Sequence, residues 1–247
     1  MLERGAVIGA PVTAGAFDEV AEVVLDSARA GRGGYVCVAN AHMAVTARRD
    51  PALRAIMTRA LAVASDGMPL VWSLRRAGLD AERVAGPDLM ARLCARAAEE
   101  GMPIYLYGGG AATFETLART LAARFPGLRI AGREAPPMLP PRPARDEAAR
   151  ARIAASGARL VFVGLGCPKQ EFWMAAQAPG LPAVLLGVGA AFDFLAGITP
   201  RAPRWMQRAG LEWLFRLICE PRRLWRRYLV TNGLFLWYLA RDRLGRA

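Results

Sequence analysis

Short apolar runs alternate with longer amphipathic segments along the first two hundred residues. Six of these runs predict β-strands, at residues 35–39, 61–64, 104–107, 128–131, 160–163 and 183–186. Most are uninterrupted apolar runs rather than alternating ones, which is typical of strands that are covered on both faces. The pattern therefore indicates a buried, mostly parallel sheet.

The segments between these runs predict helices, at residues 88–100, 111–125, 146–156 and 170–178. The first follows Pro87, a residue that favours the first helical turn. The second ends before Pro126 and Gly127, which together are a stop signal. Strand and helix in alternation at this spacing predict an α/β fold, a doubly wound, mostly parallel sheet with helices on both faces.

Two segments depart from this alternation. Residues 135–144 include five prolines, so they can form neither a helix nor a central strand and are predicted to be a loop. From Pro200 onward Arg, Trp and Leu dominate and the alternation stops. We therefore expect a Rossmann-like α/β domain over residues 1–200 and a basic, helical, Trp-rich appendage over residues 201–247.

The charge is concentrated in this predicted appendage. From Arg201 to the C-terminus there are eleven arginines against three acidic residues, which gives +8 of the formal net charge of +12. Such a local basic segment indicates a local anionic partner. No apolar run reaches the roughly 20 residues that a transmembrane helix needs, and residues 1–12 have too short an apolar stretch for a signal peptide. We expect a protein of the cytoplasm that binds peripherally to the inner face of the cell membrane.

The four cysteines support the same compartment. None of them forms a C-x-x-C pair, and three lie within apolar runs. Small buried thiols in a reducing compartment explain this pattern best.

Candidate chemistry gathers where the predicted strands end, because ligands of open parallel sheets bind beyond the carboxyl ends of the strands. Three of the ends are rich in glycine, which lets the backbone approach a ligand closely, and the helix that follows can hold phosphate. The residues after five of the strands are Asn40 and His42, Ser65-Asp66-Gly67, Gly108-Gly109-Gly110, residues 164–171 and residues 187–193.

Each of these features also has a purely structural interpretation. Glycines at strand ends are often turn residues, and Asp66 could be an ordinary N-cap. Asp88 could simply favour the helix dipole, and His42, the single histidine, could be a structural residue. Asp193 could make a structural hydrogen bond as readily as a ligand contact.

Several function classes lose support from the motifs. None of the three glycine-rich ends has the full G-x-G-x-x-G fingerprint, so a nucleotide-binding oxidoreductase is only the alternative hypothesis. The single lysine, Lys169, follows a proline, so there is no Walker loop, and one histidine with scattered cysteines gives no zinc pattern. Without an Asp-x-Asp pair we expect neither a metal nor another cofactor. A non-catalytic membrane-surface or nucleic-acid-binding protein would leave the glycine-rich ends and Asp66 unexplained, and we expect no nucleic-acid partner.

Five of these segments, taken in order, resemble one family. They are residues 40–42 (Asn-Ala-His), 65–71 with the central Asp66-Gly67, 83–88 (Arg-Val-Ala-Gly-Pro-Asp), 164–171 (Gly-Leu-Gly-Cys-Pro-Lys-Gln-Glu) and 187–194, which end in Phe-Asp-Phe. Their order and spacing resemble glycosyltransferase family 26, the WecG/TagA/CpsF group, from about residue 35 to residue 227. Some members carry Thr two places before the Asn where this chain has Val38, so acceptor identity is not carried over.

The resemblance implies an inverting transferase that moves a sugar from a UDP-sugar to an undecaprenyl-diphosphate-linked sugar, for surface polysaccharide or teichoic acid. It also implies Asp66 as the general base.

 Asn40 and Gln170 are the other catalytic candidates, because their side-chain amides are suited to orient the reacting groups.

The remaining candidates divide between the two substrates. For the donor they are Gly108, Gly164, Gly166, Lys169 and Asp193, the last of which suits the hydroxyls of a ribose. For the acceptor and its diphosphate they are His42, Arg83, Asp88, Arg222, Arg223 and Arg226. Four tryptophans lie among the C-terminal arginines, as expected for a helix at an anionic membrane surface. The oligomeric state stays open, a homo-oligomer included.

Overall fold

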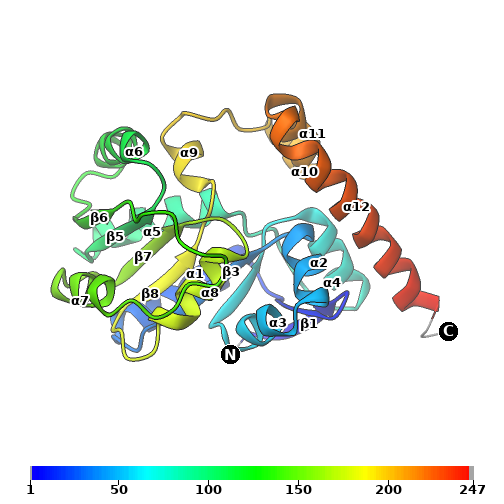
Figure 1. The fold of residues 1–247 in the computed structure, drawn as a ribbon, viewed down its shortest axis with the longest axis horizontal. Helices are drawn as coiled ribbons and strands as arrows, with labels where there is room; N and C mark the ends of the chain where they lie inside the picture. Colours follow the sequence, from blue (N-terminus) through cyan, green and yellow to red (C-terminus); the bar gives the residue numbers. More distant parts are fainter. Residues whose placement is uncertain (1, 245–247) are drawn as a thin grey trace.

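The computed structural model describes residues 2–244 of the chain. Met1 and residues 245–247, the ends of the two predicted regions, lie outside the described residues. The centre of the molecule is a six-stranded parallel sheet in the order β4-β3-β8-β7-β5-β6 (Figure 1). Its strands are β3 (Gly34–Ala39), β4 (Ala62–Ser65), β5 (Ile104–Gly108), β6 (Ile130–Glu134), β7 (Leu160–Gly164) and β8 (Val184–Gly187).

All six predicted strands are present, and every pairing in this sheet is parallel. The register places the glycine-rich ends side by side, because Gly108 is opposite Gly164 and Val163 is opposite Gly187. β6 begins two residues later than predicted. It is an edge strand with alternating half-buried and exposed residues, so its apolar pattern is the weakest of the six.

Helices cover both faces of the sheet, each over its own hydrophobic core. One core is covered by α1 (Phe17–Arg29), α5 (Gly86–Glu99), α6 (Ala111–Arg124) and α9 (Ala191–Leu195). The other is covered by α2 (Ala41–Arg49), α3 (Pro51–Arg59), α4 (Met68–Arg76), α7 (Glu147–Ala155) and α8 (Lys169–Gln177). The doubly wound α/β fold is confirmed.

An N-terminal hairpin was not predicted. β1 (Arg4–Val7) and β2 (Ala10–Thr13) pair antiparallel, and the backbone N–H of Val63 in β4 donates to Thr13 Oγ1 at 2.8 Å. The hairpin thus lies beside the outer strand of the sheet. The proline-rich residues 135–144 contain no helix or strand, as predicted.

Three of the described helices lie beyond residue 200: α10 (Arg204–Arg208), α11 (Glu212–Cys219) and α12 (Pro221–Leu244). α12 runs along the edge of the molecule beside α2 (Figure 1). Among the described side chains of α12, those of Leu224, Thr231 and Phe235 are buried, and their spacing of seven and four places them on one stripe. This stripe faces the α/β domain, so α12 is docked along it.

Among residues 2–244, no helix combines the length and the apolar character that crossing a membrane requires.

Candidate active site

Asp66 lies directly after β4, where the strand gives way to α4. Its backbone N–H donates to Ala39 O at 2.8 Å, which fixes the end of β4 beside the end of β3. The side chain is 28% exposed, so the carboxylate is accessible from solvent on one side only. Burial raises the pKa of Asp66 to about 6, Arg83 opposes this rise and Glu212 adds to it. A carboxylate with such a pKa is mostly ionised at neutral pH and still accepts a proton readily.

Arg83 is the basic group closest to this carboxylate. Its Nη2 lies 3.6 Å from Asp66 Oδ1, and its Nε donates to the backbone oxygen of Asp66 at 2.8 Å. The same guanidinium binds Glu212 of α11. Arg83, predicted from sequence as an acceptor ligand, therefore joins the sheet to the C-terminal helices.

Asp88 makes a second link of this kind. It lies in the first turn of α5 and forms a bidentate ion pair with Arg201, in which Nη2 and Oδ2 are 2.6 Å apart. This pair lowers the pKa of Asp88, although burial acts in the opposite direction as the largest single influence. The carboxylate thus holds a C-terminal arginine close to the strand ends.

Asn40 and His42 follow β3. Asn40 is the N-cap of α2, because its Oδ1 accepts from the backbone N–H of Met43 at 3.2 Å. Its amide group is therefore partly used in the fold. His42 lies in α2, and burial together with the positive charge of Arg227 in α12 lowers its pKa. A C-terminal arginine thus lies close to this strand end too.

The glycine-rich ends of β5 and β7 pack against each other and against Phe192. A Cβ at Gly108 would lie 2.7 Å from the backbone of Gly164, and a Cβ at Gly164 would lie 2.7 Å from the Phe192 ring. Gly108 also has a φ of +96°, in the region that favours glycine. These contacts alone require glycine at both positions, and a nucleotide contact is an additional hypothesis.

Gln170 and Glu171 lie in the first turn of α8, which follows the loop after β7. Gln170 is 3% exposed, and its Oε1 accepts from the backbone N–H of Gly166 at 3.1 Å. Its Nε2 donates to Glu171 Oε1 at 2.8 Å. Glu171 is fully buried, and burial raises its pKa to about 7. The two side chains therefore shape the loop from within, and Glu171 was not singled out from the sequence.

Lys169 and Asp193 are both half-buried. Lys169 is the first residue of α8, and Asp193 lies in the short helix α9, where its backbone oxygen accepts from Ile198 and Thr199. Both residues thus follow strand ends, as the sequence predicts, and their roles toward a donor stay predictions.

The C-terminal arginines that act on Asp66 are not the ones predicted from the sequence. Arg222, Arg223 and Arg226 are exposed on α12, and their contact with an acceptor stays a prediction. The C-terminal arginines whose charge reaches Asp66 are Arg201 and Arg216. Arg201 and Arg216 are not among the predicted site residues, because only the fold brings their charges near Asp66.

Some of these guanidinium groups keep a free donor. Among the described residues, the buried Nε atoms of Arg201, Arg216 and Arg227 have no hydrogen-bond partner. Buried donors of this kind usually find one. An anionic ligand such as a diphosphate would supply suitable acceptors.

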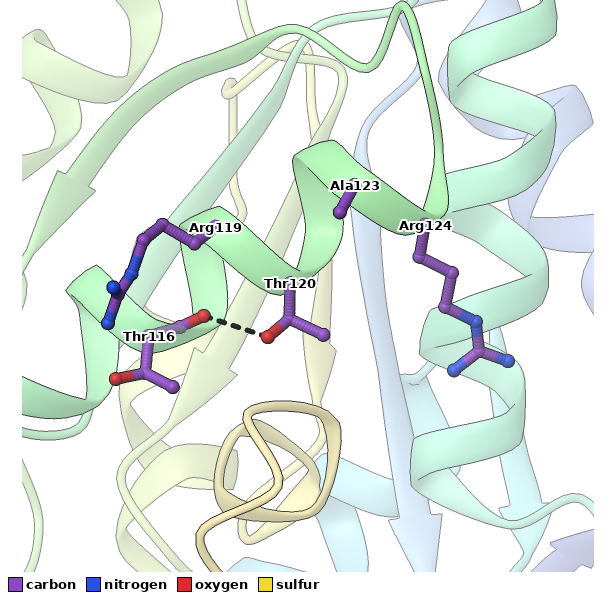
Figure 2. Close-up of a pocket in the computed structure, with 5 residues that line it drawn as sticks. All are labelled: Thr116, Arg119, Thr120, Ala123 and Arg124. Carbon is purple, nitrogen blue, oxygen red and sulfur yellow. Dashed lines mark hydrogen bonds between the residues drawn. The ribbon is translucent and has the colours of Figure 1, made fainter.

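A separate hollow lies along α6 (Figure 2). It is lined by Thr116, Arg119, Thr120, Ala123 and Arg124, all from that one helix. The hydroxyl of Thr120 donates to the backbone oxygen of Thr116 at 3.0 Å. None of the predicted site residues lines this hollow, so it is not the candidate active site.

The fold and the site together define a class: an α/β protein with a carboxylate base candidate and arginines at the carboxyl ends of its strands, as expected for a transferase that handles a diphosphate. Residues 6–247 match the glycosyl transferase WecG/TagA/CpsF family. The match covers nearly the whole chain, so the protein belongs to this family and is a glycosyltransferase. Membership implies a nucleotide-sugar donor and a sugar acceptor, and it gives no support to the oxidoreductase alternative.

Proposed function

We propose that this glycosyltransferase moves a sugar, with inversion, from a UDP-sugar to an undecaprenyl-diphosphate-linked sugar in the synthesis of bacterial surface polysaccharide or teichoic acid. The observation that carries the proposal is the position of Asp66. It is a half-buried carboxylate at a strand end, with Arg83, Arg201 and Arg216 in electrostatic reach. This arrangement combines a base with positive charge for a diphosphate.

Asp66 would take the proton of the acceptor hydroxyl. The hydroxyl oxygen then attacks the anomeric carbon of the donor sugar, and the bond from that carbon to the diphosphate breaks. UDP leaves with the bonding electrons, and the attack from the opposite side inverts the anomeric centre. The raised pKa of Asp66 supports this role, because a general base works best when its pKa is near the working pH.

The donor would bind along the ends of β5, β7 and β8. Gly108, Gly164 and Gly166 would allow the backbone to approach the nucleotide, with Lys169 at the start of α8 close to its phosphates. Asp193 would bind the ribose. We propose catalysis without a metal, because the sequence has no Asp-x-Asp pair and arginines can stabilise the leaving diphosphate.

The acceptor would approach from the side of the C-terminal helices. Trp225, Leu229, Leu236 and Trp237 are exposed on α12 beside exposed arginines. Apolar and basic side chains in this combination bind anionic membrane surfaces. We propose that the protein attaches peripherally to the inner face of the membrane, where the lipid-linked acceptor resides.

The test is transfer by the full chain from a panel of UDP-sugars to a synthetic lipid-diphosphate-sugar, with and without chelator. Asp66→Asn should lower the rate by roughly 10²–10⁴-fold and leave UDP binding intact. Asp80→Asn, at an exposed aspartate, is the matched control and should act as wild type. Near wild-type turnover by Asp66→Asn would exclude Asp66 as the base, and a strict need for added metal would refute metal-free catalysis.

A further inference from the structure

One guanidinium lies between two carboxylates at the end of β4. Arg83 Nη2 is 3.6 Å from Asp66 Oδ1, and the same nitrogen binds Glu212 Oε2. The two acids come from different parts of the fold, since Asp66 follows a strand of the sheet and Glu212 is the first residue of α11. Arg83 therefore divides its charge between the α/β domain and the C-terminal helices.

The position of Arg83 is fixed from three directions. Besides the bond from its Nε to the backbone oxygen of Asp66, its Nη1 donates to Gln207 Oε1 at 3.2 Å. Gln207 in turn donates to the backbone oxygen of Ala202 at 2.8 Å. The side chains of Arg83 and Glu212 are only 16% and 19% exposed, so solvent screens their interaction weakly.

If Arg83 paired with Asp66 alone, Asp66 would be a weaker base. A guanidinium paired fully with a carboxylate stabilises its charged form and lowers its affinity for a proton. We propose that Glu212 is a positioning residue for Asp66: by binding Arg83, it prevents a full Arg83–Asp66 ion pair and keeps Asp66 a competent base. The consequence for catalysis rests on the proposed function, whereas the effect on the proton affinity of Asp66 does not.

The other charges around Asp66 are consistent with this role. The charges of Arg201 and Arg216 also act on Asp66 and favour its ionised form. Arg201 is paired with Asp88, and the guanidinium of Arg216 lies 5.3 Å from the centre of the Phe194 ring. Glu212 opposes these positive charges, and it can do so only while α11 is docked. Docking of the C-terminal helices would therefore set the strength of the base.

The test measures the pKa of the Asp66 carboxyl by ¹³C NMR in the full chain, with the signal assigned by its loss in Asp66→Asn. Glu212→Gln keeps the size and a hydrogen-bond acceptor but removes the charge, and it should lower this pKa by roughly one unit. Glu212→Asp should restore most of the shift. Glu220→Gln is the matched control, because Glu220 pairs with Arg223 instead, and it should change nothing.

The route through Arg83 is tested by repeating Glu212→Gln in an Arg83→Gln background, where the shift should shrink. An unchanged Asp66 pKa in Glu212→Gln, or an equal shift without Arg83, overturns the proposal. The acid limb of the pH–rate profile should move down with the NMR value. If the NMR shift occurs while Asp66→Asn remains active, the positioning effect stands and the proposed base is wrong. Thermal unfolding of each variant shows that it is folded.

Discussion

The α/β domain and the three C-terminal helices bury their apolar side chains very differently. The largest fully buried side chains, such as Trp173, Tyr107 and Phe162, all belong to the α/β domain. Of the twelve exposed large apolar side chains among the described residues, nine lie beyond residue 200. Leu224 and Phe235 are the large side chains of the described C-terminal helices that are buried.

This difference separates two sources of stability. The α/β domain is held by apolar burial on both faces of its sheet. Helices of 5, 8 and 24 residues with so little burial gain most of their stability from what they contact. Their contacts to the domain include the buried stripe of α12, which lies beside α2, and the ion pairs of Arg83, Arg201 and Asp242. The face of the C-terminal helices that points away from the α/β domain is apolar and basic. An exposed face of this kind indicates an interaction site for a membrane or another partner.

The largest expected effect concerns that outer face. Replacing Arg222, Arg223 and Arg226 by Gln should weaken binding to vesicles with anionic lipid by roughly 100-fold, since each arginine contributes about 1 kcal/mol. Replacing Trp225, Leu229, Leu236 and Trp237 by Ser should weaken it further in a vesicle-sedimentation assay. These variants are preferable to deletion of the region, because deletion would also remove Phe235 from the core it shares with α2.

Leu224→Ala, at a buried position on the same helix, is the matched control. It should lower stability without removing the membrane-binding face. Wild-type binding by the substituted proteins, or no binding by the intact protein, would refute the membrane proposal and leave the outer face for another partner.

The same contrast explains what the sequence could predict. The strands were predictable because each is a local apolar run, and the position of Asp66 at a strand end was predictable because it follows one of these runs. The expected membrane-surface helix did not distinguish the apolar residues of α12 from one another: Leu224 is buried against the domain, while Leu229 is exposed. Which part of the apolar side faces α2 depends on tertiary packing and leaves no local pattern.

Contacts between distant residues were also beyond prediction. Arg83 and Glu212 are 129 positions apart, and neither has a local pattern that marks it as a partner. From the sequence Asn40 was expected to be an orienting amide, and its hydrogen bond with the backbone N–H of Met43 shows that it also caps α2. Glu171 is a charged residue type in a polar motif, so its complete burial was not expected from its neighbours.

A smaller effect concerns the buried carboxyl group of Glu171 in the α/β domain. The pKa of Glu171 is raised from its ordinary 4.5 to about 7 by burial, so the folded state holds the proton more tightly than the unfolded state. This contribution to stability is complete below pH 4.5 and is lost as the pH rises to about 7. Glu171→Gln has no carboxyl group to ionise, so it should not lose this stability as the pH rises. At pH 8 it should be more stable than wild type by roughly 2–3 kcal/mol.

Denaturant unfolding of both proteins at pH 4.5 and pH 8 measures the difference. Glu115→Gln, on the exposed side of α6, is the control and should show the pH dependence of wild type. Equal stability of Glu171→Gln and wild type at both pH values would show that the buried carboxyl group is not the source of the pH dependence.

The smallest effect concerns the contact that joins the two regions at the far end of α12. Arg48 of α2 and Asp242 form a bidentate ion pair with distances of 2.8 and 2.9 Å, and the Arg48 guanidinium lies 4.6 Å from the centre of the Tyr238 ring. Both side chains are about a quarter to a third exposed, so the pair should contribute only about 0.5–1 kcal/mol. A double-mutant cycle with Arg48→Gln and Asp242→Asn measures this coupling, and salt should reduce it.

The cycle also distinguishes two states of α12. If α12 stays docked when the protein binds a membrane, protection of the α2 and α12 amides from hydrogen exchange should depend on both residues with and without anionic vesicles. If α12 leaves α2 to enter the surface, the coupling should be present in solution and vanish on the vesicles. No coupling in either condition would mean that α12 is not held along α2, and the link between C-terminal docking and Asp66 would then depend on Arg83 and Arg201 alone.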